Sequence, residues 1–310
     1  MSAYLKNIES FYPLSPMQQG MLFHSLSAPE SGVYVEQVGC LLRGELDVEA
    51  FGKAWQRVAD RHSVLRTFFI VQGPKEPVQA VKRDVAVVME VRDVCAKNPA
   101  EQEKEFAEFC RTDRRQGFEL SKPPLMRLVL MRTSATSHFF LWSHHHLLLD
   151  GWSVPMVLQE VMLLYEALRK GRTLRLPAPR PYRDYIVWLR KQDLSKAETF
   201  WRSLLKGFTA PTPLVVNRLK KNEGSDQPHS YAEQELWLDP VDTAALDAMA
   251  RRHQLTPNTL MQGAWALLLS RYSGERDVLF GATVAGRPAS LPGVDAMLGL
   301  FINTLPVRVQ

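Results

Sequence analysis

The 310-residue sequence has few cysteines and no long uncharged apolar run. Its three cysteines, Cys40, Cys95 and Cys110, are irregularly spaced and form no C-x-x-C pair, which argues against a disulfide framework or a zinc site and suits a reducing cytoplasm. We expect all three to be buried as small apolar side chains. No run approaches the roughly 20 apolar residues that span a bilayer, and the start lacks a basic segment followed by an apolar one. Neither membrane insertion nor export is therefore expected.

The sequence also lacks a strong excess of charge of one sign. Its 38 basic and 33 acidic residues give a net charge of +5, and only the stretch around Arg218, Lys220 and Lys221 is locally basic. Such a stretch is typical of a solvated loop, so no nucleic-acid partner is predicted. With 45% hydrophobic residues the chain can bury a sizeable core, most naturally as two domains.

Apolar periodicity predicts an α/β order of elements. Asp47 is placed to cap a helix that closes at Arg61-His62, and Ser153 to cap another that runs to about Lys170. The other expected elements are strands over 35–42, 65–71, 85–91, 125–132, 138–142, 233–237 and 278–283, and helices over 100–111, 240–253 and 256–272.

Two segments punctuate this order. Leu176-Pro-Ala-Pro-Arg-Pro181 cannot lie inside a helix and predicts the domain boundary, with residues 1–176 in a first lobe and 177–310 in a linker and second lobe. A polar loop is expected over 210–229. Both halves carry Leu-Asp before a helix that closes with Arg-His, at 46–62 and 238–253, which fits either an internal duplication or coincidence.

The most informative motif runs from His145 to Gly151 and fits the pattern H-H-x-x-x-D-G. It follows a predicted strand and precedes a predicted helix. Because alternate strand residues face opposite sides, His144 and His146 would share one face and His145 the other. Imidazole, whose unperturbed pKa is about 6.5, can accept a proton near neutrality and return it. No G-x-S-x-G nucleophile elbow is present, so the attacking group would come from a substrate.

Other interpretations of these residues remain open. His144, His146 and Asp150 could ligate a metal, although no second His or Cys cluster completes a site. The histidines could also simply satisfy backbone groups in a polar turn. Asp150 is placed to stabilise the new helix, to pair with an arginine and to orient His146, and Gly151 allows a tight turn and supplies an N–H as a potential oxyanion donor. The phosphate-loop spacing of 281–288 lacks the Lys and the Ser or Thr of that motif.

The chain resembles the condensation domains of nonribosomal peptide synthetases, within the chloramphenicol-acetyltransferase-like superfamily. Five stretches carry the resemblance in order and span essentially the whole chain. They are Tyr12–His24, Arg61–Phe69, His145–Gly151, Tyr182–Trp188 and Gly299–Arg308.

This resemblance implies two α/β sandwich lobes in a V shape, with the active site where they meet and a carrier protein approaching from each side. His146 matches the functional second histidine of the family, and His145, Asp150 and Gly151 complete the catalytic motif. Asp150 matches the structural aspartate, and Arg61 the arginine that usually pairs with it. Asn303, Trp152 and Ser153 are weaker candidates for the substrate cleft, and no metal is expected. Because the family continues past the fifth motif, the chain ending at Gln310 looks like a fragment whose second lobe is incomplete and exposes strand edges and apolar surface.

The implied reaction is peptide-bond formation between a donor aminoacyl or peptidyl thioester and an acceptor aminoacyl thioester. No bound cofactor is needed, because the substrates arrive on the phosphopantetheine arms of carrier proteins. The expected partners are upstream and downstream peptidyl carrier proteins and an adenylation domain, in the cytoplasm. The stretch Leu14–Gly20 resembles domains that accept D-configured donors. An epimerization domain and a non-catalytic docking module are the main alternatives. A heterocyclisation domain, which has paired aspartates in place of the histidine motif, and a relative that uses free coenzyme A fit less well.

Overall fold

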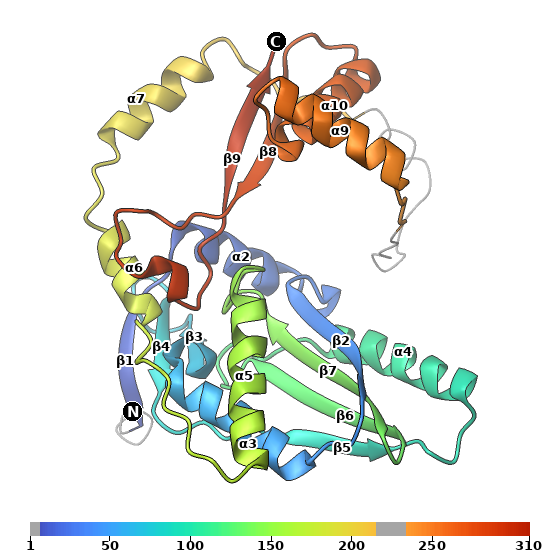
Figure 1. Ribbon diagram of the computed structural model, residues 1–310. Coiled ribbons are helices and arrows are strands. Elements are labelled where there is room, and N and C mark those ends of the chain that lie inside the picture. The colour runs from blue at the N-terminus through green and yellow to red at the C-terminus, as the bar shows by residue number, and fades with distance from the viewer. Residues whose placement is uncertain (1–6, 215–233) are drawn as a thin grey trace. The chain divides into compact units, whose positions relative to one another are not determined.

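The computed structural model describes residues 7–214 and 234–310, and it has the mixed α/β character that the sequence predicts (Figure 1). The chain divides into two compact units. The first contains Met1–Gln192 and Ala285–Ile302, and the second contains Asp193–Val284 and Asn303–Gln310. The Leu176–Pro181 segment lies within the first unit, and a lobe boundary there remains a prediction.

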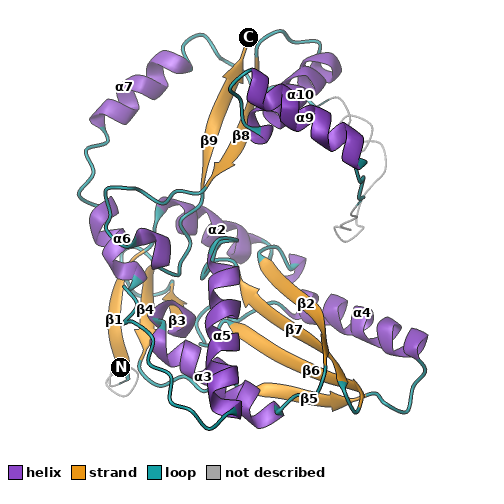
Figure 2. Ribbon diagram, in the orientation of Figure 1, coloured by secondary structure: helices purple, strands orange, loops and turns teal. Residues whose placement is uncertain are grey.

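A four-stranded sheet forms the centre of the first unit (Figure 2). Its order is β2 (Val35–Arg43), β7 (Ser137–His145), β6 (Met126–Ser134) and β5 (Met89–Asp93), with only the β5–β6 pair parallel. Side chains alternate between its faces. Phe140 and Trp142 belong to the main core, whereas Leu141 belongs to a second cluster on the other face.

Two of the helices that line the main core lie after β2 and after β7 in the sequence. They are α3 (Val48–Arg61), on which Trp55 is fully buried, and α5 (Ser153–Arg169), on which Val157 and Val161 are buried. Their apolar residues recur at three- and four-residue spacing, so each helix buries one stripe. The helix α4 (Pro99–Gln116) packs on the opposite face of the sheet through Phe106 and Phe109.

The first unit also contains a second sheet and further helices. A three-stranded sheet has the order β1 (Ile8–Pro13), β4 (Val78–Lys82) and β3 (Thr67–Ile70). Between β1 and β2 lies α2 (Pro16–Ser27), which starts with a reciprocal capping box between Ser15 and Gln18. The helix α6 is Tyr182–Leu189.

Several predicted elements are confirmed and others are displaced. Asp47 caps α3 by accepting a hydrogen bond of 2.9 Å from the Ala50 N–H. The helix after the motif ends at Arg169 as expected, but Ser153 is its first residue and not its cap. The strand expected at 85–91 is also displaced, because β5 begins only at Met89.

The second unit contains a two-stranded antiparallel sheet among its described residues. It is formed by β8 (Val278–Val284) and β9 (Asn303–Val309). The helices are α7 (Ser195–Leu204), α9 (Pro240–Arg252) and α10 (Pro257–Ser273). Asp239 caps α9 as Asp47 caps α3.

The strand expected at 233–237 is wrong for residues 234–237, which form no regular element. Residue 233, the basic stretch around Arg218 and most of the expected 210–229 loop lie outside the described residues.

The expectation that the cysteines are buried is wrong. Cys40 and Cys95 are exposed and Cys110 is partly exposed. The physical reason is position: Cys40 lies on the edge strand β2, Cys95 follows the edge strand β5, and Cys110 packs only against the margin of the second cluster from α4. Among the described helices, none combines the length and apolar character needed to cross a bilayer.

Candidate active site

The histidine motif forms the turn between β7 and α5. The sheet ladder continues one step past β7, because the His146 N–H donates a 2.8 Å hydrogen bond to the Tyr34 carbonyl. Leu147, Leu148 and Leu149 are fully buried. The apolar middle of the motif thus anchors the turn in the core, and the polar residues at its two ends are held in fixed places.

A buried glutamine of the first motif also holds this turn. The Gln18 Nε2 group donates a 3.0 Å hydrogen bond to the Leu147 carbonyl and contacts the Gln79 amide. Gln18 is only 1% exposed, so the lost hydration of its amide is replaced by these contacts. The first and third motifs are therefore joined directly.

The ring of His146 is held in one tautomer. Its Nδ1 lies 2.8 Å from the Leu149 carbonyl oxygen. Because a carbonyl can only accept, Nδ1 carries the proton and Nε2 of the neutral ring has a free lone pair. The side chain is half-buried and makes no other hydrogen bond to the described residues. His146 can therefore accept a proton at Nε2.

His145 points into different surroundings. Its Nδ1 accepts a 3.1 Å hydrogen bond from the Leu147 N–H, and its Nε2 faces the Ser25 hydroxyl at 3.3 Å. Burial, with the neighbouring histidines, lowers its pKa to about 3. The ring lines a cavity of about 810 Å³ whose walls are mainly apolar, including Leu26 and Phe118. His145 is thus neutral and partnered within the fold, and its ring is kept apart from His146.

His144 is part of the core. It is 1% exposed, packs against Trp142 with ring centroids 4.7 Å apart, and has no hydrogen-bond partner on either ring nitrogen among the described residues. Burial lowers its pKa to about 4. Within those residues, no three His, Cys, Asp or Glu side chains gather as a metal site would require.

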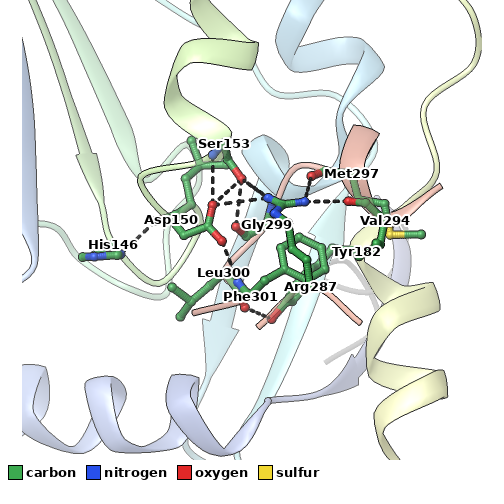
Figure 3. A network of polar contacts seen from close by, with 11 residues as sticks. His146, Asp150, Ser153, Tyr182, Arg287, Val294, Met297, Gly299, Leu300 and Phe301 are labelled. Atoms are coloured by element: carbon green, nitrogen blue, oxygen red, sulfur yellow. Dashed lines mark hydrogen bonds and ion pairs between the residues drawn. The ribbon is translucent and has the colours of Figure 1, made fainter. Parts of the chain in front are cut away.

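Asp150 lies at the centre of a buried polar network (Figure 3). Its Oδ1 accepts from the Ser153 N–H at 2.9 Å and the Ser153 hydroxyl at 2.7 Å, and its Oδ2 accepts from the Phe301 N–H at 3.0 Å. The Asp150 N–H donates to the Gly299 carbonyl at 3.0 Å. Third and fifth motifs are joined by this carboxylate, which makes no hydrogen bond to His146 in the described chain.

Arg287 supplies the positive charge in this network. Its Nη2 lies 3.4 Å from Asp150 Oδ1 and donates to the Ser153 hydroxyl at 3.1 Å, while its Nη1 donates to two backbone carbonyls, of Val294 and Met297. The guanidinium also stacks over the Phe301 ring at 4.1 Å. Five contacts fix the arginine, which in turn neutralises the buried carboxylate.

The expected pairing of Arg61 with Asp150 is wrong. Arg61 donates to Glu160 at 3.1 Å and to the Pro177 carbonyl at 2.9 Å. Glu160 lies two turns beyond the start of α5, about 10 Å along the helix axis, so the end of α3 meets α5 away from Asp150. Arg61 instead fastens the segment that leaves α5.

The remaining predicted residues occupy three different settings. Ser153 is fully buried in the Asp150 network and does not line an open surface. Gly151 and Trp152 are exposed. Asn303 is an exposed residue at the start of β9, in the second unit, where its side chain accepts a 2.9 Å hydrogen bond from the Thr304 N–H.

Gly151 is not required by its backbone or by packing. Its φ lies outside the left-handed region, and a Cβ added to it would meet no atom within 4 Å. Its N–H donates no hydrogen bond to the described residues. The open space and the free N–H leave room for another molecule at this end of the motif.

The sequence prediction missed Gln18, Tyr34 and Arg287. Gln18 had a signal, because Ser15-Pro16-Met17-Gln18 is a capping-box pattern with proline at the first helical position. Arg287 follows Gly286, whose φ is +63° and where an added Cβ would lie 1.8 Å from the Phe301 carbonyl oxygen. That glycine is the signal for a close approach of two chain segments, and its spacing resembles a phosphate loop only by coincidence.

Comparisons with known proteins give one consistent family. A family model described as a condensation domain matches residues 8–310. The chain is 51% identical over 306 residues to one of the linear gramicidin synthase subunits of Brevibacillus parabrevis, covering 99% of this chain and 6% of that protein. It is 42% identical over 308 residues to one of the mycosubtilin synthase subunits of Bacillus subtilis, covering 99% of this chain and 12% of that protein. The chain thus spans a small part of these relatives.

Solved structures with the same fold are more distant in sequence. The first condensation domain of the calcium-dependent antibiotic synthetase, in complex with a substrate analogue, matches with a TM-score of 0.78 at 19% identity, covering 97% of this chain and 69% of that one. The condensation domain from Monacolin K polyketide synthase matches with a TM-score of 0.77 at 21% identity, covering 98% and 69%. These likenesses establish the fold.

Proposed function

Because the chain belongs to the condensation-domain family, we propose that it forms an amide bond between two thioesters held on carrier proteins in nonribosomal peptide synthesis. The donor is an aminoacyl or peptidyl thioester and the acceptor an aminoacyl thioester. One observation carries the proposal: the Leu149 carbonyl accepts the Nδ1 proton of His146, so that Nε2 of this ring, in the turn between β7 and α5, is a proton acceptor.

In this mechanism the acceptor amine attacks the donor thioester carbonyl, a C–N bond forms, and the carbonyl electrons move to oxygen. The result is a zwitterionic tetrahedral intermediate. His146 Nε2 takes a proton from the former amine nitrogen of this intermediate. The carbonyl re-forms, the C–S bond breaks, and the departing thiolate takes the proton from His146. An α-amino group has a pKa near 8, so about a tenth is already free base at pH 7 and ground-state deprotonation would gain little. The main work of His146 is to orient the amine and remove the later proton.

The free N–H of Gly151 suits the charge that develops in this step. A backbone N–H that has no partner among the described residues can donate to the tetrahedral oxyanion without first breaking a hydrogen bond within the protein. Gly151 also lies next to the N-terminus of α5, where the helix dipole favours negative charge. We assign it the role of oxyanion donor.

Asp150 is assigned a positioning role. Its carboxylate is saturated by Ser153, Phe301 and Arg287, and none of these contacts involves the imidazole. It acts through the backbone, since Leu149, whose carbonyl holds His146, directly precedes it. Asp150 therefore fixes the end of the turn and does not take part in proton transfer.

We infer that the substrates reach the site on phosphopantetheine arms of upstream and downstream carrier proteins, with an adenylation domain as a further neighbour and the cytoplasm as the setting. The names of the relatives support this, because they are synthase subunits of which a single condensation domain is a small part. The thioester already supplies the activation, so the proposed chemistry uses no bound cofactor.

The test mixes the protein with a donor-loaded and an acceptor-loaded carrier and follows the acceptor by intact mass spectrometry. It is run on the 310-residue chain and on a version extended to the length of the solved condensation domains. A gain equal to the donor acyl mass supports condensation. Deuterium incorporation at the α-carbon of one loaded residue, without acyl transfer, would support the epimerization alternative. Carrier binding with neither reaction, by both versions, would support a docking module.

The finer assignment concerns donor configuration. The stretch Leu14–Gly20 is similar to that of domains that accept D-configured donors, and Gln18 in it contacts the catalytic turn. We propose that a D-configured donor reacts faster than its L-enantiomer. Equal or reversed rates for the two enantiomers, on the same carrier, would refute this assignment and leave the reaction itself intact.

A further inference from the structure

Tyr34 lies directly opposite the proposed catalytic histidine. The antiparallel register pairs Val35 with His145, and one step further Tyr34 meets His146. The Tyr34 carbonyl accepts the His146 N–H at 2.8 Å. This is the last contact of the ladder, and it sets the point at which His146 leaves the sheet.

The backbone of Tyr34 is in a conformation that tyrosine rarely adopts. Its φ is +66°, in the left-handed region that favours glycine. Such conformations persist where the surroundings over-determine them, and they gather at functional sites. Gly32, two residues earlier, also has a left-handed φ of +64°, and a Cβ there would lie 2.8 Å from the Arg114 carbonyl. The approach to β2 is therefore pinned against the end of α4.

The ring of Tyr34 contacts both histidines of the motif. Its centroid lies 6.4 Å from that of His146, edge to face at 78°, and 6.4 Å from that of His145, at 48°. A third imidazole, His24, is 6.5 Å away. These separations are in the range of aromatic pairs. The ring fills the space around the imidazoles and limits the orientations open to His146.

We propose that Tyr34 is a positioning residue for His146, with its left-handed backbone receiving the His146 N–H and its ring confining the imidazole. Confinement keeps Nδ1 on the Leu149 carbonyl and Nε2 free. The inference rests on the proposed function, since it assigns Tyr34 to the reaction of that same histidine. It also explains why a tyrosine, and not the glycine that the backbone favours, occupies this position.

The experiment compares Tyr34→Phe, Tyr34→Leu and Tyr34→Gly with the unchanged protein. Two quantities are measured: the single-turnover rate of acyl transfer between loaded carriers across pH, and the ring-nitrogen NMR signals of His146, which report the tautomer without any reaction. Tyr34→Phe keeps the ring and is expected to match the unchanged protein in both. Tyr34→Gly relieves the backbone but removes the ring, and is expected to lose about 10- to 100-fold in rate, with a changed pH–rate profile and mixed tautomer signals.

Tyr34→Leu keeps apolar bulk but not the aromatic edge. Like Tyr34→Gly, it is expected to lower the rate of acyl transfer and to give mixed tautomer signals. If Tyr34→Gly fails to fold, the rate and the tautomer signals of Tyr34→Leu test the positioning role of Tyr34. Full rates and an unchanged tautomer in both variants would overturn the inference. His146→Ala is measured in parallel, and a loss confined to that variant overturns the role of Tyr34 alone. A full rate in His146→Ala would refute the role of His146 and with it that of Tyr34. Absence of acyl transfer by the unchanged protein would instead refute the proposed function.

Discussion

Arg287 and Asp150 form a solvent-excluded ion pair in the first unit. The Nη2 and Oδ1 atoms are 3.4 Å apart, and the two side chains are 5% and 0% exposed. Although 137 residues separate them in the sequence, this pair joins the third motif to the segment before the fifth. Its geometry carries the first two predictions.

Replacing Arg287 by leucine should destabilise the fold by about 3–5 kcal/mol, because it leaves the Asp150 carboxylate buried without a counter-charge. Urea unfolding of the purified chain measures the change. Arg61→Leu is the matched control, since Arg61 pairs with the partly exposed Glu160 and should cost only about 1 kcal/mol. Equal losses in the two variants would show that the buried Arg287–Asp150 pair stabilises the fold no more than the partly exposed Arg61–Glu160 pair.

The effects of Asp150 and Arg287 should not add. Asp150→Ala leaves the Phe301 N–H and the Arg287 charge unpaired, so it should lower soluble yield and stability severely. In the double variant Asp150→Ala with Arg287→Leu the unpaired charge is absent. The double loss should therefore be smaller than the sum of the single losses by about 0.5–3 kcal/mol in a urea double-mutant cycle. Strict additivity would contradict the coupling.

Stability should fall in mild acid because of two buried histidines at the end of β7, His144 and His145. Burial lowers the pKa of His144 to about 4 and that of His145 to about 3, below the unperturbed value of about 6.5. Unfolding then takes up protons below pH 6.5, so the free energy of unfolding decreases from there towards pH 4, by about 1.4 kcal/mol per pH unit for each histidine. Above pH 7 both rings are neutral in the folded and the unfolded chain, so these two histidines cause no loss of stability there.

Unfolding in urea at pH 7, 6 and 5 checks this dependence. His144→Leu should make the slope shallower, since one of the buried titrating rings is gone. His253→Gln is the control, because His253 is exposed at the end of α9, and it should leave the slope unchanged. A slope that His144→Leu does not alter would contradict the assignment to this ring.

Gly151 should tolerate substitution structurally but not functionally. Because an added Cβ meets no atom within 4 Å, Gly151→Ala should keep or slightly raise the thermal midpoint, and it retains the N–H. Gly151→Leu should change the free energy of unfolding by less than about 0.5 kcal/mol and yet slow acyl transfer, because its side chain fills the open space. A fully active Gly151→Leu would show that no substrate uses that space.

The sequence predicted best where local signals agree with packing. Asp47 caps α3, and the apolar stripe of that helix through Phe51, Trp55 and Val58 is buried as its spacing indicates. The helix α2 was missed because a buried glutamine, Gln18, stands in the core-facing row, so no purely apolar stripe marks it. There a tertiary hydrogen bond replaces apolar packing.

The errors share a long-range cause. Motif likeness pairs Arg61 with Asp150, yet the partner is Arg287, which only the folded chain brings close. The apolar strand around Cys40 suggests burial, but that strand is an edge. The left-handed φ of Tyr34 has no sequence signal, because tyrosine favours extended strands. Local patterns do not encode which strand becomes an edge or which distant arginine meets a carboxylate.

The most direct test of the account is the single-turnover rate of His146→Ala, with donor and acceptor loaded on carriers and His145→Ala in parallel. General-base catalysis predicts a loss of about 10²- to 10⁴-fold for His146→Ala. His145→Ala should lose less at equal folded concentration, because its ring is buried away from His146. An undiminished rate in His146→Ala would contradict the assignment of Nε2 as the proton acceptor.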